Sequence, residues 1–233
     1  MASGTLFIVA TPIGNLQDIT LRAIETLKAV DAIFCEDTRV TAKLLAHLGV
    51  TKPLFAYHQH SSDAVVAQIA STLREGMQVA LVSDAGTPGI NDPGGALIAR
   101  LLAAEPGLAV VPIPGPNAAV TTLSVSGFPA DRFQYWGFIP HKKGRQTLFR
   151  ELALCEDTVV LYESKHRILK TLGEMQAAFA AAGTPDRPVV LGRELTKQFE
   201  TLYRGTVEQV ATALQNDEVL GEFVLIVGPK GWR

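Results

Sequence analysis

The first half of the chain alternates short apolar runs with amphipathic segments, and this alternation strongly constrains the fold. The segments between the runs carry apolar residues at helical spacing. Strands that are apolar throughout are typical of a parallel sheet covered by helices on both faces. We therefore expect an α/β fold with a mostly parallel sheet. The expected strands are Leu6–Ala10, Ala32–Cys35, Leu54–Tyr57, Val79–Val82 and Ala109–Val111, and the expected helices are Ile19–Val30, the segment around Leu44 and Leu45, Val65–Leu73 and 96–104.

The segment Pro112–Pro116 divides the chain. Its three prolines and one glycine are incompatible with a helix interior or a central strand. A helix of small residues is expected next, over Asn117–Ser126. We place the domain boundary here, with one domain over residues 1–115 and a second over 116–233. In the second domain we expect strands near Phe133–Phe138, Thr158–Tyr162, Val189–Leu191, Thr201–Gly205 and Phe223–Val227, and helices near 144–154, 166–182 and 206–215.

The composition is that of a compact globular protein. The chain has 233 residues, of which 47% are hydrophobic and 19% are charged, so it can bury a large core. Cys35 and Cys155 lie far apart without metal-type partners, which favours reduced thiols in a cytoplasmic protein. The sequence contains no signal peptide and no apolar run of about 18 residues, so we expect neither export nor a membrane span.

The charge distribution allows a local basic patch but no globally basic protein. The formal net charge is −2, whereas the segment 132–150 contains five basic residues and no acidic one. On charge alone, a solvated start of a helix explains this segment equally well. The five residues are Arg132, Lys142, Lys143, Arg145 and Arg150.

Several common site motifs are absent from the sequence. No G-x-x-x-x-G-K-[ST] occurs, no G-x-G-x-x-G follows the first strand, and no G-x-S-x-G is present. A P-loop nucleotidase, a dinucleotide site and a hydrolase triad therefore lack support. His58-Gln59-His60 offers two imidazoles at the end of a strand. Because no third ligand is paired with them, we expect no metal site.

Three loops rich in glycine and proline each follow a strand of the first domain. They are Pro12–Asn15, Ser83–Pro93 and Pro114–Asn117. The carboxyl ends of parallel strands lie at one edge of a sheet, and open α/β sheets bind small ligands there. We therefore expect the loops to converge on one crevice made of backbone and small side chains. Such a crevice suits a cofactor held by backbone amides and carbonyls.

Polar clusters follow three other strands. They are Glu36–Arg39, Tyr162–Arg167 and Arg193–Lys197. Helix capping and surface charge would explain each cluster alone. We favour a functional interpretation because two acids and an arginine at Glu36–Arg39 would meet the crevice formed by the loops.

Taken together, these motifs resemble the bacterial ribosomal RNA small subunit methyltransferase I family. This family is part of the tetrapyrrole methylase superfamily of S-adenosylmethionine-dependent enzymes. The resemblance extends over essentially the whole chain, from Thr5 to Val227. The matching segments, in order, are Ala10–Thr20, Glu36–Arg39, Ser83–Gly94, Pro114–Pro116, Tyr162–Ser164 and Glu194–Lys197.

The resemblance implies a fold, a cofactor and a substrate. It implies two α/β domains with S-adenosylmethionine in a cleft between them, usually in a homodimer. It also implies 2′-O-methylation of a cytidine ribose in the decoding region of 16S rRNA, in the small ribosomal subunit. Family members commonly continue with a helical extension, whereas this chain ends at Gly228–Arg233, so we expect either a short member or a truncated chain. The implied cofactor contacts are Pro12, Gly14, Asp84, Ala85, Gly86, Thr87, Ile90, Asn91, Asn117, Ala118, Glu163 and Thr196, with the segment Asp84–Asn91 acting mainly through its backbone.

Methyl transfer to a ribose hydroxyl is mainly a positioning task, which a general base assists. The candidate bases are the carboxylates of Glu36, Asp37 and Glu163, and Lys165 would serve if it were buried. Loss of each phosphate contact should reduce the salt slope of RNA binding by about 0.7–0.9. The residues expected to hold RNA phosphates are Arg39, Lys142, Lys143, Arg145 and Arg167.

Two other functions remain open at this point. Methylation of a tetrapyrrole carbon predicts a wide apolar cleft and has no need of the basic segment 132–150. The Glu36–Arg39 cluster and the opening motif argue against it. A non-catalytic module that binds cofactor or RNA would bind S-adenosylmethionine without turnover.

Overall fold

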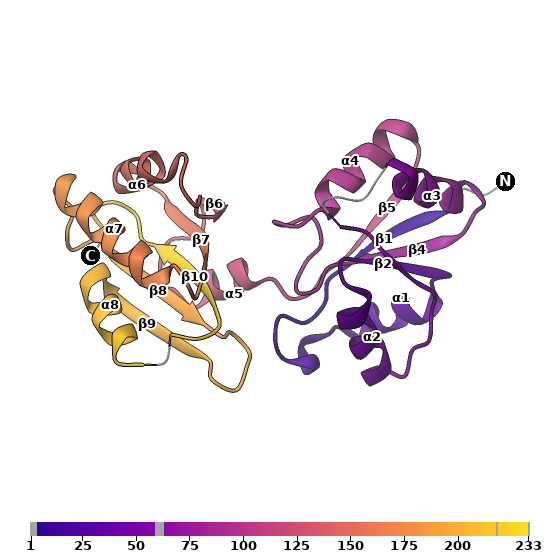
Figure 1. Ribbon diagram of the computed structural model, residues 1–233, viewed down its shortest axis with the longest axis horizontal. Coiled ribbons are helices and arrows are strands. Elements are labelled where there is room, and N and C mark those ends of the chain that lie inside the picture. Colours follow the sequence, from indigo (N-terminus) through magenta and orange to yellow (C-terminus); the bar gives the residue numbers. More distant parts are fainter. Residues whose placement is uncertain (1–3, 59–62, 218, 233) are drawn as a thin grey trace. The chain divides into compact units, whose positions relative to one another are not determined.

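The computed structural model describes residues 4–58, 63–217 and 219–232. The chain divides into two compact units, Met1–Asn117 and Ala118–Arg233. Each unit contains one five-stranded sheet with helices packed around it (Figure 1). The division follows Asn117, just beyond the Pro112–Pro116 segment.

The sheet of the first unit is wholly parallel, with the strand order β3-β2-β4-β1-β5. The expectation of a parallel α/β sheet is therefore confirmed. Pro112 lies inside β5, beyond the expected end of this strand. Because β5 is an edge strand, it tolerates a residue without an N–H group. The strands are β1 (Thr5–Val9), β2 (Ala32–Cys35), β3 (Leu54–Ala56), β4 (Gln78–Val82) and β5 (Ala109–Ile113).

Helices cover both faces of this sheet, as Figure 1 shows. Alternate strand residues face opposite ways. Ile33 and Ala80 therefore share a core with Leu27 of α1, while Leu81 shares the other core with Ile69 of α3. A short 3-10 helix, η1 (Leu16–Asp18), precedes α1. The α-helices are α1 (Leu21–Ala29) and α2 (Thr38–His47) on one face, and α3 (Asp63–Arg74) and α4 (Gly94–Ala104) on the other.

The sheet of the second unit is mixed, with the strand order β6-β7-β10-β8-β9. β6 is parallel to β7, and β10 is antiparallel to both β7 and β8. Consequently β6, β7 and β8 run in the same direction and end at the same edge of the sheet. The strands are β6 (Phe133–Phe138), β7 (Thr158–Ser164), β8 (Pro188–Arg193), β9 (Thr201–Thr206) and β10 (Glu222–Val227).

Three helices of the second unit lie on one face of its sheet and a short helix lies on the other (Figure 1). Gly192 permits the close approach of the short helix, since a Cβ there would lie 3.2 Å from Cγ2 of Thr122. The helices are α6 (Arg145–Leu154), α7 (Ile168–Ala181) and α8 (Val207–Gln215) on the first face, and α5 (Ala118–Ser124) on the second. Within the described ranges, every helix is too short or too polar to cross a lipid bilayer.

Candidate functional site

The glycine-rich loops of the first unit meet at the carboxyl edge of the parallel sheet. Thr11 and Gly86 exchange two backbone hydrogen bonds, with N–O distances of 2.9 and 3.1 Å. The Thr87 hydroxyl donates to the carbonyl of Pro116 at 3.1 Å. A Cβ on Gly86 would lie 3.4 Å from Cγ2 of Ile13. The expected convergence of the three loops is therefore confirmed.

The longest loop is held in shape by its own polar groups. Oδ1 of Asp92 accepts hydrogen bonds from the amides of Gly89 at 2.8 Å and Gly94 at 2.7 Å. Gly86 and Asn91 have φ angles of 83° and 68°, a region that favours glycine. A defined backbone with exposed peptide groups is the kind of surface that can hold a cofactor. Of the predicted contacts here, Gly14, Asp84, Ala85, Ile90 and Asn91 are exposed, Pro12 and Thr87 are half-buried, and Gly86 is buried.

The Glu36–Arg39 cluster joins the same edge. The backbone amide of Asp37 donates to Oδ1 of Asp84 at 3.0 Å. The Asp37 carboxylate accepts from the exposed Arg39 guanidinium, with an Nη2–Oδ2 distance of 2.6 Å. These hydrogen bonds lower the pKa of Asp37 to about 2. The Asp37 carboxylate is therefore held in place by Arg39 and is a poor proton acceptor. Its side chain also caps the N-terminus of α2.

Glu36 has the opposite electrostatic environment. Partial desolvation raises the pKa of Glu36, and the neighbouring carboxylates of Asp84 and Asp92 add to this effect. Desolvation also raises the pKa of Asp84. Glu36 lines a small hollow together with Tyr57 and Asp92. Of the proposed bases, Glu36 is thus the one whose surroundings favour uptake of a proton.

Of the segment considered for metal binding, the structure describes only His58. Gln59 and His60 lie outside the described residues. Among the residues that the structure does describe, no group of three histidines, cysteines or carboxylates could hold a metal ion.

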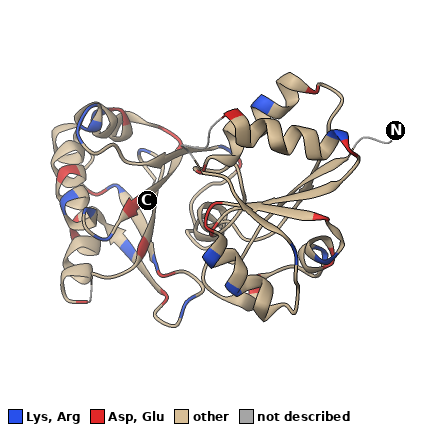
Figure 2. Cartoon of the chain, turned by 45° about the vertical axis from the view of Figure 1, so that its right-hand side comes forward, with Lys and Arg blue, Asp and Glu red and all other residues tan. Residues whose placement is uncertain are grey.

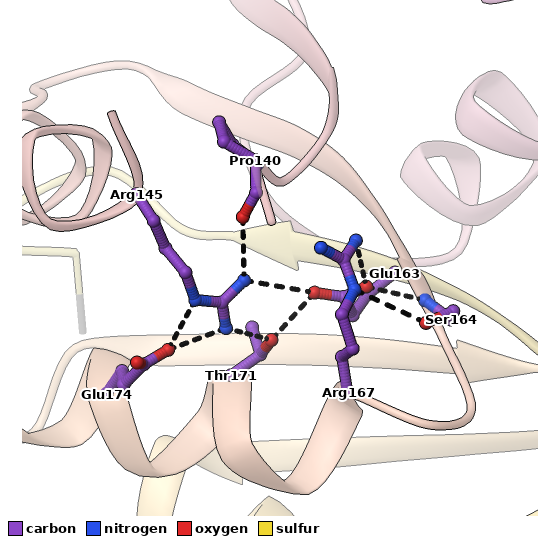
Figure 3. Close-up of polar contacts among 7 residues, drawn as sticks. All are labelled: Pro140, Arg145, Glu163, Ser164, Arg167, Thr171 and Glu174. Atoms are coloured by element: carbon purple, nitrogen blue, oxygen red, sulfur yellow. Dashed lines mark hydrogen bonds and ion pairs between the residues drawn. The ribbon is translucent and has the colours of Figure 1, made fainter. Parts of the chain in front are cut away.

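In the second unit, Glu163 is the centre of a buried ion-pair network (Figure 3). Its side chain is 0% exposed, and both carboxylate oxygens are engaged. Oε1 lies 2.6 Å from Nη2 of Arg167 and accepts from the amide of Ser164 at 2.7 Å. Oε2 accepts from the Thr171 hydroxyl at 2.7 Å and lies 3.6 Å from Nη1 of Arg145.

Arg145 completes this network from the first turn of α6. Its side chain is 5% exposed, and its Nε and Nη2 both lie 2.6 Å from Oε2 of Glu174. Nη2 also donates to Thr171 at 2.7 Å, and Nη1 donates to the carbonyl of Pro140 at 3.2 Å. The guanidinium stacks over the ring of Phe149 at 5.0 Å. Every nitrogen of this guanidinium therefore has a partner inside the unit (Figure 3).

The positions of Arg145, Glu163 and Lys165 correct their sequence-based assignments. Arg145 cannot present its charge to an RNA phosphate, because it is buried and fully hydrogen-bonded. The Glu163 carboxylate is not a free base, because it is buried and both of its oxygens are engaged. A cofactor contact through the backbone of Glu163 stays a prediction. Lys165 is exposed, so the burial required for its role as a base is not met. Arg167 is 16% exposed and stays a candidate for phosphate binding.

The remaining predicted residues, of which Asn117 ends the first unit and the others belong to the second, lie on loops and element ends. Lys142 and Lys143 are exposed in the loop before α6. Asn117 and Ala118 are half-buried beside the start of α5. Thr196 has a φ of 65°, a strained value for a β-branched residue, and its amide donates to Glu200 at 2.5 Å. Strain of this kind clusters at ligand sites, so Thr196 stays a predicted cofactor contact.

Sequence reasoning missed Thr171 and Glu174, which hold Arg145 in place. Both lie on α7, three residues apart and next to the buried Leu172 and Met175. A polar pair at this spacing beside apolar core positions is a signal that could have indicated a buried partner.

Comparison with known proteins shows to which family the chain belongs. The profile of the family described as Tetrapyrrole (Corrin/Porphyrin) Methylases matches residues 5–211. Among solved structures, uroporphyrin-III-C-methyltransferase from Thermus thermophilus is 23% identical with a TM-score of 0.65, covering 97% of this chain and 94% of that one. The same enzyme complexed with S-adenosyl homocysteine gives 20% identity and a TM-score of 0.63, covering 97% of each chain. These structures share the fold.

Relatives of higher identity narrow the assignment. The ribosomal RNA small subunit methyltransferase I of Escherichia coli O157:H7 is 47% identical over 97% of this chain and 78% of that protein. The protein of the same name from Halalkalibacterium halodurans is 45% identical over 98% of this chain and 77% of that protein. The chain therefore belongs to the ribosomal RNA small subunit methyltransferase I family, within the tetrapyrrole methylases.

Proposed function

We propose that this protein transfers a methyl group from S-adenosylmethionine to the 2′-hydroxyl of a cytidine ribose in 16S rRNA. The observation that carries the proposal is the 45–47% identity, over almost the whole chain, to proteins named ribosomal RNA small subunit methyltransferase I. The convergent loops of the first unit support it, because they offer the backbone-lined edge that a cofactor needs.

The loops of the first unit would hold S-adenosylmethionine. Their fit rests on the defined backbone of Asp84–Asn91, which is fixed by the Thr11–Gly86 bridge and by the hydrogen bonds to Asp92. We assign Pro12, Gly14 and the Asp84–Asn91 segment to cofactor binding, with Asn117, Ala118, Thr196 and the backbone of Glu163 as further contacts. When bound, S-adenosylmethionine supplies a methyl group already activated by its sulfonium.

Glu36 is our candidate for the general base. A ribose hydroxyl is a weak nucleophile, and a positioned base contributes about 10²–10⁴-fold to such reactions. The raised pKa of Glu36 suits it to this role, whereas the lowered pKa of Asp37 does not suit Asp37. Asp37 is assigned instead to holding Arg39 and the start of α2.

We propose that a few exposed cationic side chains, rather than a broad basic surface, bind the RNA phosphates. Basic and acidic residues are spread over both units, as Figure 2 shows. The proposed contacts are Arg39, Lys142, Lys143 and the exposed part of Arg167. Lysine and arginine contacts of this kind make binding salt-dependent. Binding by the double variant Lys142→Ala/Lys143→Ala should therefore be weaker and less dependent on salt than binding by the wild type.

Transfer of a labelled methyl group tests the proposal directly. The substrate is S-adenosylmethionine with a labelled methyl, offered with small ribosomal subunits that lack the modification or with free 16S rRNA. We expect label at a ribose, seen as an alkali-resistant linkage. Cofactor binding without transfer to either RNA would contradict the proposal, and label in a tetrapyrrole offered in a parallel assay would establish the rival reaction.

The proposed function also carries expectations about the location and the oligomeric state of the protein. The substrate implies a cytoplasmic enzyme, and the family resemblance implies a homodimer. Light scattering coupled to size-exclusion chromatography would test the dimer, for which the expected mass is twice 25.0 kDa. A single species at the monomer mass under assay conditions would contradict it.

A further inference from the structure

A bulge in β6 sets the direction of the last residue of this strand. Tyr135 is aligned with Val160 of β7, but Gly137 is aligned with Leu161, so Trp136 is the extra residue. Gly137 has a φ of 68°, which a residue without a Cβ adopts without strain. Bulges of this kind redirect side chains and are common next to active sites.

The bulge places Phe138 on the face of Tyr162. Phe138 is aligned with Tyr162, whereas an unbroken register from Tyr135 would have aligned it with Glu163. Successive residues face opposite sides of a sheet, so the one-residue shift moves Phe138 from the side of the buried ion pairs to the side of α5. The rings of Phe138 and Tyr162 meet edge to face, 5.5 Å apart at 65°.

Phe138 is both supported and exposed. Tyr162 also contacts the ring of Tyr135 at 5.5 Å, and its hydroxyl accepts a hydrogen bond from the amide of Ala119 at 3.1 Å. Tyr162 is therefore a fixed support for the Phe138 ring. Phe138 itself remains 54% exposed, although the strand continues into the buried Ile139. A supported but exposed aromatic ring is a surface on which a planar group can stack.

The charges near Phe138 favour an anionic partner. The carboxyl ends of β6, β7 and β8 share one edge, and we call residues 138–143, 164–167 and 194–200 at this edge the basic edge. Lys142, Lys143 and Lys165 are exposed there, and no ion pair involves them among the described residues. The acidic groups at and beside the basic edge have partners, since Glu194 and Glu222, the first residue of β10, both pair with Lys197, and Glu200 accepts from Thr196.

We propose that Phe138 is a stacking platform for an unpaired base of the RNA substrate, with Lys142 and Lys143 holding phosphates beside that base. This inference rests on the proposed function and specifies how the substrate is recognised. Proteins read single-stranded RNA by stacking bases on aromatic side chains and by tracking the backbone with cations. A paired base in a helix has no free face to offer, so the platform selects a single-stranded segment.

The test compares Phe138→Ala and Phe138→Tyr with a matched control on the same strand. Phe133, at the opposite end of β6, is 38% exposed, and Phe133→Ala removes the same side chain away from the basic edge. The probe is a short mixed-sequence RNA, either single-stranded or annealed to its complement, titrated at several salt concentrations. Binding of S-adenosylmethionine and the melting temperature report whether each variant is intact.

We expect Phe138→Ala to weaken binding of the single-stranded RNA about tenfold or more. Phe138→Tyr and Phe133→Ala should bind this RNA like the wild type, and the salt slope of Phe138→Ala should be unchanged. Lys142→Ala should instead reduce the slope by about 0.7. KM for small ribosomal subunits should rise in Phe138→Ala in the same proportion.

Two kinds of failure can be told apart. If the wild type methylates 16S rRNA but Phe138→Ala binds single-stranded RNA as Phe133→Ala does, the platform is wrong and the proposed function stands. The platform is also wrong if Phe138→Ala weakens duplex and single-stranded RNA equally. If the wild type binds and methylates a tetrapyrrole instead of RNA, the proposed function and the platform both fall.

Discussion

The two units form their polar edges by different physical means. In the first unit the edge is tied together mainly by backbone, as in the paired hydrogen bonds of Thr11 and Gly86. In the second unit the edge rests on a buried set of charges centred on Glu163 and Arg145. The first arrangement depends on which residues can adopt the loop conformation, and the second depends on whether every charge keeps its partner.

The two sheets account for this difference. In the wholly parallel sheet of the first unit, every strand delivers a loop to the same edge, and these loops can bond to one another. In the mixed sheet, β9 and β10 begin at the edge where β8 and β7 end, so fewer loops are free to interlock. Side chains that reach from α6 and α7 to the end of β7 take over that role.

The largest effect should follow from breaking the charge network of the second unit. Arg145→Met leaves Glu163 and Glu174 with one cation fewer inside the unit. Removing one partner of a buried ion pair costs about 3–5 kcal/mol of unfolding free energy. Both tryptophans, Trp136 and Trp232, lie in the second unit, so tryptophan fluorescence during denaturation by urea reports on this unit.

Arg150→Met is the matched control for this experiment. Arg150 lies on the same helix but is exposed, and it bonds only to Thr147 among the described contacts. Its replacement should change the unfolding free energy by less than about 0.5 kcal/mol. Equal effects of the two substitutions would show that the network does not stabilise the second unit and would remove the contrast between the units.

The next largest effect should follow from Glu36→Gln in the first unit. This change keeps the size of the side chain but removes the proposed base, so kcat should fall about 10²-fold or more. The affinity for S-adenosylmethionine should stay close to that of the wild type, because the backbone of the loops is untouched. Glu25→Gln, on the exposed side of α1, is the control. A kcat within twofold of the wild type would exclude Glu36 as the base.

The pH profile sharpens the contrast between Glu36 and Asp37. Desolvation raises the pKa of Glu36 above its usual 4.5, whereas hydrogen bonds from Arg39 hold the pKa of Asp37 at about 2. Because the ionised form acts as the base, kcat/KM should rise with pH through a midpoint above 4.5, and this rise should be absent in Glu36→Gln. Asp37 stays ionised across this range. A midpoint below 4.5 in the wild type would contradict the assignment.

Much of the fold followed from local patterns that the structure retains. The strands Ala32–Cys35 and Phe133–Phe138 have the expected bounds, and the apolar runs of the first half form the parallel sheet. Strand direction in the second unit was not predicted, since antiparallel pairing of β10 depends on contacts between distant segments. The bulge in β6 had a signal that was not used, because an isolated glycine within a strand indicates one.

The parts of the candidate site that depend on local sequence were predictable, whereas the parts that depend on contacts between distant segments were not. The meeting of the three loops followed from strand direction alone. The burial of Arg145 did not, because a basic segment looks the same whether its side chains reach solvent or an acidic partner. That partner, Glu174, lies 29 residues further along the chain. The raised pKa of Glu36 likewise depends on burial and on Asp84 and Asp92, which only the folded chain brings near it. The lowered pKa of Asp37 has a local cause instead, because Arg39 lies two residues further along the chain.

The smallest effect should come from a single methyl group on a loop of the first unit. Gly86→Ala imposes a side chain at a φ of 83° and puts its Cβ 3.4 Å from Ile13. Gly49→Ala imposes comparable strain at a φ of 64°, but nothing lies within 4 Å of its Cβ and it is remote in sequence from the three loops. Each change should cost about 1–2 kcal/mol of stability.

Binding separates these two glycine variants. Calorimetric titration with S-adenosylmethionine should show about tenfold weaker binding for Gly86→Ala and unchanged binding for Gly49→Ala, because Gly86, unlike Gly49, bonds to Thr11 where the loops meet. Arg145→Met, assayed under conditions where it stays folded, should bind the cofactor through the first unit as Gly49→Ala does. If Gly86→Ala binds S-adenosylmethionine as tightly as the wild type does, the backbone hydrogen bonds between the loops are not needed for the cofactor site. The two units would then differ only in the buried charge network of the second unit.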